Sequence, residues 1–93
     1  MEENKAGGYS SARALEAHDK EVFDKALGGI VGVSYTPEQV STQIVAGTNY
    51  RFFCKYTTAT ALPEAGIAIV TIFEELPVYG GKVTVTDITR YHN

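Results

Sequence analysis

The sequence has one cysteine, no long apolar run and no excess of positive charge, and each shortage excludes a class of protein. Because Cys54 has no second cysteine to pair with, an internal disulfide framework is excluded. No apolar stretch approaches the roughly 20 residues that span a bilayer, so we expect no membrane association. The net charge of −3, with acidic groups scattered along the chain, offers no basic face for nucleic acid. These absences leave an ordinary soluble globular domain.

The 93 residues are enough for one modest hydrophobic core. Residues 1–9 are charged and then glycine-rich, which predicts a flexible N-terminal arm, followed by a single domain over residues 10–93. The first nine residues also lack the apolar stretch of a secretory signal peptide. Together with the single cysteine, this favours a reducing, cytoplasmic location.

The pattern of apolar residues predicts one helix followed by strands. From an N-cap at Ser10 or Ser11, apolar residues recur at helical spacing as far as Leu27, and two glycines then end the helix. After Pro37 the period changes to 2, and turn residues separate four extended segments. Residues 30–33 either extend the first strand or link it to the helix. We therefore expect an α+β fold in which one helix packs on a four- to five-stranded antiparallel sheet.

In such a meander, the first and third turns lie at the same end of the sheet. A helix antiparallel to the first strand starts at that end too, which brings three segments together: residues 6–8, 45–47 and 76–79. Small and apolar residues dominate all three segments. This composition is typical either of ordinary turns or of a patch that meets a partner.

Residues 43–47, Gln-Ile-Val-Ala-Gly followed by Thr-Asn-Tyr, resemble the Gln-x-Val-x-Gly signature of the cystatins. The stefins, which are the cytosolic and disulfide-free branch, carry a glycine near the N-terminus, this pentapeptide at the first hairpin and Leu-Pro in a later hairpin. Here residues 7–8, 43–47 and 76–77 occupy these places in the same order. The resemblance covers essentially the whole chain from Gly7 to Tyr91.

The resemblance implies a cystatin-like fold and a reversible, tight-binding competitive inhibitor of papain-like cysteine proteases such as papain and cathepsin L-type enzymes. The arm and two hairpin loops would enter the active-site cleft as a wedge and block it without being cut. No catalytic residue, metal or cofactor is implied. The implied protease-binding residues are Gly7, Gly8, Gln43, Ile44, Val45, Ala46, Gly47, Leu76 and Pro77.

The sequence departs from the stefin pattern at two places. Residues 57–66 form a longer and more apolar second turn, and the Leu-Pro loop continues as Val-Tyr-Gly-Gly in place of the usual polar residues. Tryptophan, which the secreted cystatins use in this loop, is absent.

The sequence has few candidates for a catalytic nucleophile, a metal site or an acid/base pair. Cys54 could act as a nucleophile with His18 or His92 as base, but it alternates with apolar residues on a strand face and fits a core position better. Both histidines are expected in solvent, without metal-ligand spacing. Adjacent Glu74 and Glu75 should point to opposite faces and keep the strand end soluble. A cystatin-fold binding or scaffold module without inhibitory activity is the main alternative, and a small enzyme is a third.

The first turn also predicts a change of oligomeric state. Val45 is β-branched and poorly suited to a tight reversal between two long strands. If this hinge opens, the helix and first strand can pair with a second molecule, so we expect a monomer that can form a domain-swapped dimer.

Overall fold

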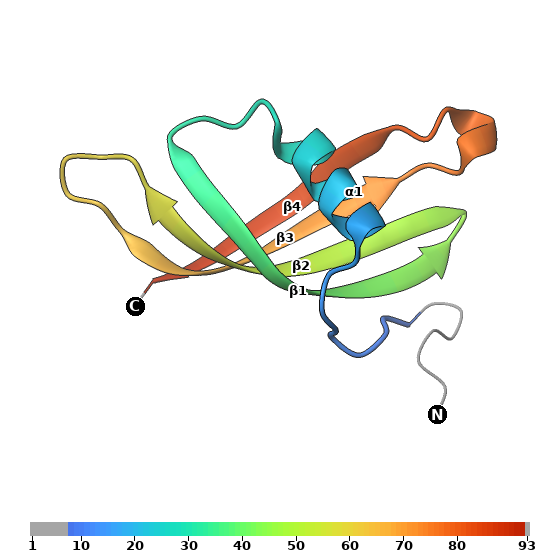
Figure 1. The fold of residues 1–93 in the computed structure, drawn as a ribbon, viewed down its shortest axis with the longest axis horizontal. Helices are drawn as coiled ribbons and strands as arrows, with labels where there is room; N and C mark the ends of the chain where they lie inside the picture. The colour runs from blue at the N-terminus through green and yellow to red at the C-terminus, as the bar shows by residue number, and fades with distance from the viewer. Residues whose placement is uncertain (1–7, 93) are drawn as a thin grey trace.

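The computed structural model describes residues 8–92, in which one α-helix lies across a four-stranded antiparallel sheet (Figure 1). The elements are α1 (Ala17–Leu27), β1 (Val33–Val45), β2 (Gly47–Thr58), β3 (Ala65–Glu74), the 3-10 helix η1 (Pro77–Tyr79) and β4 (Val83–His92). The strands neighbour one another in chain order. The predicted α+β meander under one helix is therefore confirmed, with four strands.

The alternation in β2 places the core between the sheet and α1. All four apolar residues that alternate along this strand are buried: Tyr50, Phe52, Cys54 and Tyr56. The apolar run in β3 does not alternate clearly in sequence, so the sequence leaves open which of its residues face the core. In the structure Ala68, Val70 and Ile72 are buried on the core face. Phe23 of α1 meets Phe52 edge-on, with ring centroids 5.0 Å apart.

The helix begins later than the sequence predicts, at Ala17 and not after Ser10 or Ser11. The residues before it pair with β1 instead: Arg13 and Val40 exchange backbone hydrogen bonds of 3.0 and 2.9 Å, and Tyr9 bridges Gln43. These backbone bonds to a strand edge hold the segment extended, and the helix can start only after the chain leaves β1. This segment forms two isolated bridges, so a fifth strand is not formed.

Strand β1 also starts earlier than predicted, at Val33, so that Pro37 lies inside it. Proline lacks an N–H group and is tolerated in a strand at an edge or a bulge. Both conditions hold, because β1 is an edge strand of the four-stranded sheet and its register to β2 shifts between Pro37 and Gln39.

The first reversal is tighter than the sequence suggests. The residues Gly-Thr-Asn at 47–49 are typical of a turn, but β2 starts at Gly47, which pairs with Val45 across a turn at Ala46 alone. The second turn spans residues 59–64 and the third contains η1, close to the predicted positions.

The two ends of the sheet carry different connections. The β1–β2 hairpin and the β3–β4 loop lie together at one end, on the right in Figure 1. The α1–β1 and β2–β3 loops lie at the other end, where the Ala59 N–H donates to the Gly32 carbonyl at 2.8 Å. The predicted meeting of the first and third turns is therefore confirmed.

Candidate functional site

Large apolar side chains are exposed at both ends of the sheet, and five of them lie at the end that holds the first and third turns: Ile44, Val45, Leu76, Val78 and Tyr79. We call residues 44–47 and 76–79 the apolar edge. Ile44 and Val45 are 49% and 42% exposed, and Val78 and Tyr79 are 80% and 70% exposed. Apolar residues exposed on neighbouring loops can form a contact surface, and this end differs from the opposite one in also carrying the residues at 43–47 and 76–77.

The first part of the apolar edge is the tip of the β1–β2 hairpin. Gly47 has a φ angle of +127°, and a Cβ atom there would lie 2.5 Å from the carbonyl oxygen of Glu74. Only glycine fits this position, because both the backbone angle and the space exclude a side chain. The pentapeptide thus ends on a glycine that lets the hairpin close against β3 and leaves Ala46 at the outermost point.

Gln43, the first residue of the pentapeptide, has a structural role beneath the tip. It is half-buried, and its Oε1 accepts a hydrogen bond of 2.7 Å from Nδ2 of Asn49 on the neighbouring strand. Gln43 and Gly47 therefore shape the hairpin, while Ile44, Val45 and Ala46 are the residues of the pentapeptide that face solvent.

The second part of the apolar edge is a short loop closed by its own backbone. The N–H groups of Tyr79 and Gly81 donate to the Leu76 carbonyl at 2.9 and 3.2 Å, and Gly80 donates to Pro77 at 3.0 Å. Both glycines have positive φ angles, +112° and +67°. The loop is therefore built to hold a fixed shape while its apolar side chains remain in solvent.

A groove of about 440 Å³ separates the two parts and reaches the start of α1. Gly47 and Thr48 line one side, and Leu76, Pro77 and Gly80 line the other. The lining of the groove also includes four charged or polar side chains: His18 and Lys25 from α1, and Glu74 and Glu75.

Glu74 links three elements beneath the apolar edge. It accepts a hydrogen bond of 2.7 Å from the hydroxyl of Tyr50, and its Oε2 lies 3.0 Å from Nε2 of His18. Burial of Tyr50 raises the pKa of its hydroxyl, and the hydrogen bond to Glu74 raises it further. The expectation that Glu74 only solubilises the strand end is wrong, and His18, although largely exposed, has a carboxylate partner. Because these residues lie far apart in the sequence, local pattern does not reveal the contacts between them.

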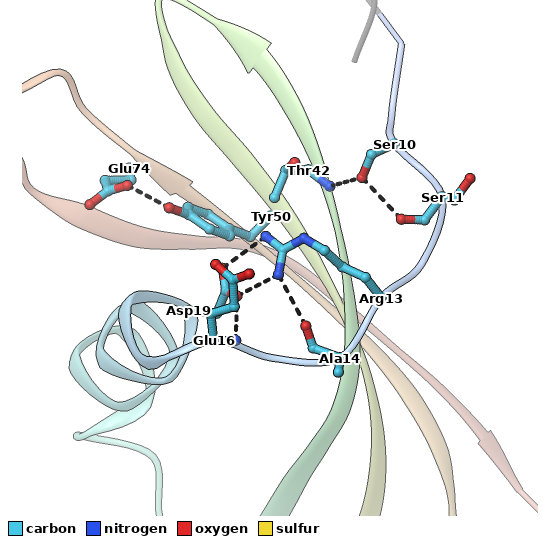
Figure 2. Close-up of polar contacts among 9 residues, drawn as sticks. All are labelled: Ser10, Ser11, Arg13, Ala14, Glu16, Asp19, Thr42, Tyr50 and Glu74. Carbon is cyan, nitrogen blue, oxygen red and sulfur yellow. Dashed lines mark hydrogen bonds and ion pairs between the residues drawn. The ribbon is translucent and has the colours of Figure 1, made fainter. Parts of the chain in front are cut away.

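The chain before α1 is held by a second polar cluster, shown in Figure 2. Arg13 donates to both carboxylate oxygens of Asp19, at 2.7 and 3.3 Å, and the Glu16 N–H donates to the same carboxylate at 2.8 Å. Burial raises the pKa of Asp19, but the hydrogen bonds from Arg13 and Glu16 outweigh it and leave this pKa below its ordinary value. The cluster fixes the start of the helix relative to β1.

The N-terminal segment reaches the apolar edge by a route that the sequence did not predict. Ser10 pairs with Thr42, its N–H donating to the Thr42 carbonyl at 2.8 Å and its Oγ accepting from the Thr42 N–H at 3.0 Å (Figure 2). Because Tyr9 bridges Gln43 in antiparallel fashion, Gly8 lies toward Ile44 and the hairpin tip. Gly7 lies outside the described residues.

A reactive thiol and a metal centre are two other kinds of chemical site that the sequence raises. Cys54 is buried under α1, as predicted, and burial raises the pKa of its thiol to about 12, so the thiol is protonated at neutral pH. Within residues 8–92, no three His, Cys, Asp or Glu side chains are grouped to hold a metal ion. The side chain of His92 lies outside what the structure describes.

Comparison of the chain with family models, curated proteins and solved structures finds no match. At 11 residues, α1 is well short of a membrane span, and no other helix in the described part of the chain reaches that length. The geometry of the apolar edge is therefore the main structural indication of function.

Proposed function

We propose that this chain is a reversible, tight-binding competitive inhibitor of papain-like cysteine proteases, with a fold of the cystatin type. The observation that carries the proposal is the apolar edge: two loops closed by hydrogen bonds lie at one end of the sheet, and Gly8 lies toward the same end. The cystatin-like motifs at residues 43–47 and 76–77 fall on this edge. A papain-like protease of the cathepsin L type is the proposed partner.

The proposed mechanism is obstruction of the active-site cleft. Ala46, the outermost residue of the first hairpin, would approach the catalytic cysteine, and Leu76 and Pro77 would rest on the primed side. Both loops are closed by hydrogen bonds within this chain, so docking costs little conformational entropy. Because the tip is a backbone turn and not an extended substrate strand, no peptide bond is presented for cleavage.

A cytoplasmic location suits this function. The only cysteine is buried and needs no oxidising compartment to support the fold. The protein would then act on proteases that reach the cytosol.

Titration of the purified protein against papain and a cathepsin L-type enzyme, with a fluorogenic substrate, tests the proposal. We expect stoichiometric, reversible loss of activity that added substrate relieves. No inhibition at micromolar concentrations of either protease would contradict it and favour a binding module that is not an inhibitor.

The apolar edge is tested by Val45→Asp, because a charge in a desolvated contact is costly. We expect at least about a hundredfold weaker inhibition, corresponding to the loss of a hot-spot residue, with an unchanged melting temperature. Val31→Asp is the matched control, since Val31 is also exposed but lies in the α1–β1 loop at the opposite end. Equal inhibition constants for the two variants would rule out the first hairpin as the contact.

A further inference from the structure

The N-terminal segment is attached to the sheet by a contact between an aromatic and a cationic side chain, Tyr9 and Arg51. Neither residue belongs to the cystatin-like motifs. The guanidinium carbon of Arg51 lies 3.9 Å from the centroid of the Tyr9 ring. Contacts of this geometry are cation–π interactions. Tyr9 is the first residue after Gly8 and is half-buried, although it stands at the end of a segment expected to be a flexible arm.

The contact crosses the edge strand. Arg51 lies between Tyr50 and Phe52, which are both buried under α1, so by alternation Arg51 points to the other face of the sheet. Tyr9 is paired through its backbone with Gln43 on β1, and its ring reaches Arg51 on β2. The side chain therefore extends over β1 on the face away from the helix.

One backbone and one side-chain hydrogen bond reinforce this attachment one residue later, where Ser10 and Thr42 form the pair described above. These two contacts hold adjacent residues of the N-terminal segment. Their partners on β1, Thr42 and Gln43, lie within three residues of Val45. Together they fix the point at which the chain before Tyr9 leaves the sheet.

We propose that Tyr9 and Arg51 form a latch that positions the N-terminal arm for binding of the protease. This inference rests on the proposed inhibitory function and deepens it. An arm that starts from a fixed point beside the hairpin tip has a higher effective concentration at the cleft than one that starts from a loose end. Tyr9 and Arg51 are positioning residues, and residues 1–8 make the contacts.

The test is a double-mutant cycle between the latch and the arm, read as the dissociation rate from papain. In the full chain, Tyr9→Ala and Arg51→Ala should each accelerate dissociation about threefold to tenfold, the range expected for a cation–π contact. In a chain lacking residues 1–7, the same substitutions should change the rate less than about twofold, because the element they position is gone.

Two variants serve as controls. Tyr9→Phe keeps the aromatic ring and should dissociate like the unmodified chain. Arg90→Ala removes the same charge from β4, where Arg90 lies 5.3 Å from the ring of Tyr56, and should also leave the rate unchanged. A change in Arg90→Ala equal to that in Arg51→Ala would assign the effect to net charge and overturn the latch.

A readout without protease separates this inference from the proposed function. Exchange of the Ser10 amide hydrogen, which is bonded to Thr42, should be faster in Tyr9→Ala than in Tyr9→Phe.

If the full chain and the chain lacking residues 1–7 dissociate from papain equally fast, the latch has no role in binding, while the inhibitor proposal stands. If the substitutions accelerate dissociation equally in both chains, Tyr9 supports the hairpin and the inference is wrong. If papain is not bound at all, the proposed function fails and the binding role of the latch fails with it.

Discussion

At the residue scale, Asp19 is the buried polar group on which the start of α1 depends. Its side chain is 4% exposed, and it accepts hydrogen bonds from Arg13 and from the backbone of Glu16. A carboxylate that is bonded in the folded state and free in the unfolded state has the lower pKa when folded. It therefore stabilises the fold above its unfolded pKa, and this stabilisation is lost as the pH falls through the folded pKa.

Asp19→Asn should therefore lower the free energy of unfolding at pH 7 by about 1–2 kcal/mol, since the charge-assisted bond to Arg13 becomes a neutral one. The deficit should begin to shrink as the pH falls below the unfolded pKa of about 4, and should vanish only below the lower folded pKa of Asp19, where the carboxyl of the unmodified chain is protonated as well. Urea unfolding of both proteins from pH 2 to pH 7 measures the difference. A deficit independent of pH would show that Asp19 acts through shape and not through charge.

Cys54→Ser tests whether the thiol has any chemical role. We expect normal inhibition and a loss of stability of about 1–2 kcal/mol, because a hydroxyl is less well accommodated than a thiol in an apolar core. Its Sγ lies 3.6 Å from the Phe52 carbonyl oxygen, which offers the new hydroxyl one acceptor. Inhibition assays and thermal unfolding check both parts. Loss of inhibition in a folded variant would restore a chemical function to the thiol.

At the element scale, the β3–β4 loop is the part of the apolar edge that departs most from the stefin pattern. Val78 and Tyr79 project into solvent from η1, while the backbone of the loop is closed on itself. Aromatic residues in rigid, exposed positions are typical of interaction hot spots. The loop thus offers a larger apolar contact than Leu76 and Pro77 alone.

Tyr79→Ser should weaken protease inhibition about tenfold, the effect of removing one hot-spot side chain, and should barely change the melting temperature. Tyr91→Ser is the matched control, because Tyr91 is 52% exposed on β4 but pairs with Ile67 near the other end of the sheet. If both substitutions have the same effect on inhibition, the β3–β4 loop does not contact the protease.

At the scale of the whole molecule, the expected domain swap depends on a second hinge residue. Within residues 8–92, positive φ angles occur only at glycines, so Val45 is not held in a left-handed conformation. The demanding position is Gly47, where the backbone angle and the approach of β3 both require the absence of a side chain. We therefore expect the exchange to depend on residue 47, in addition to the β-branched Val45 beside it.

Gly47→Ala should favour the domain-swapped dimer, because opening of the hinge lets residue 47 adopt an extended φ angle. Gly80→Ala is the control: its φ is also positive, but it lies outside the hinge, and its nearest neighbour to a Cβ is 3.6 Å away. After mild heating, size-exclusion chromatography should show more dimer for Gly47→Ala than for Gly80→Ala. The dimer should not inhibit papain, since swapping removes the hairpin tip, and a fully active dimer would place the hinge elsewhere.

The features of this protein that depend on local pattern could be predicted from the order of its amino acids. Alternate residues of a strand point to the same face, so Tyr50, Phe52, Cys54 and Tyr56 can all be buried only if that face meets the core. Because the turns are short, consecutive strands are then antiparallel neighbours. The positions of the hairpin tip and the Leu-Pro loop at one end of the sheet followed from that order.

Tertiary structure alone decided the start of α1, the route of the N-terminal segment and the polar contacts beneath the apolar edge. Residues 10–16 carry a helical pattern, but their backbone groups find partners on the edge of β1, and such pairing is not encoded in local periodicity. Glu74 meets His18, and Tyr9 meets Arg51, across more than 40 residues of chain. Contacts of this kind depend on how the completed sheet brings distant side chains together, which is why the latch at Tyr9 becomes visible only in the folded molecule.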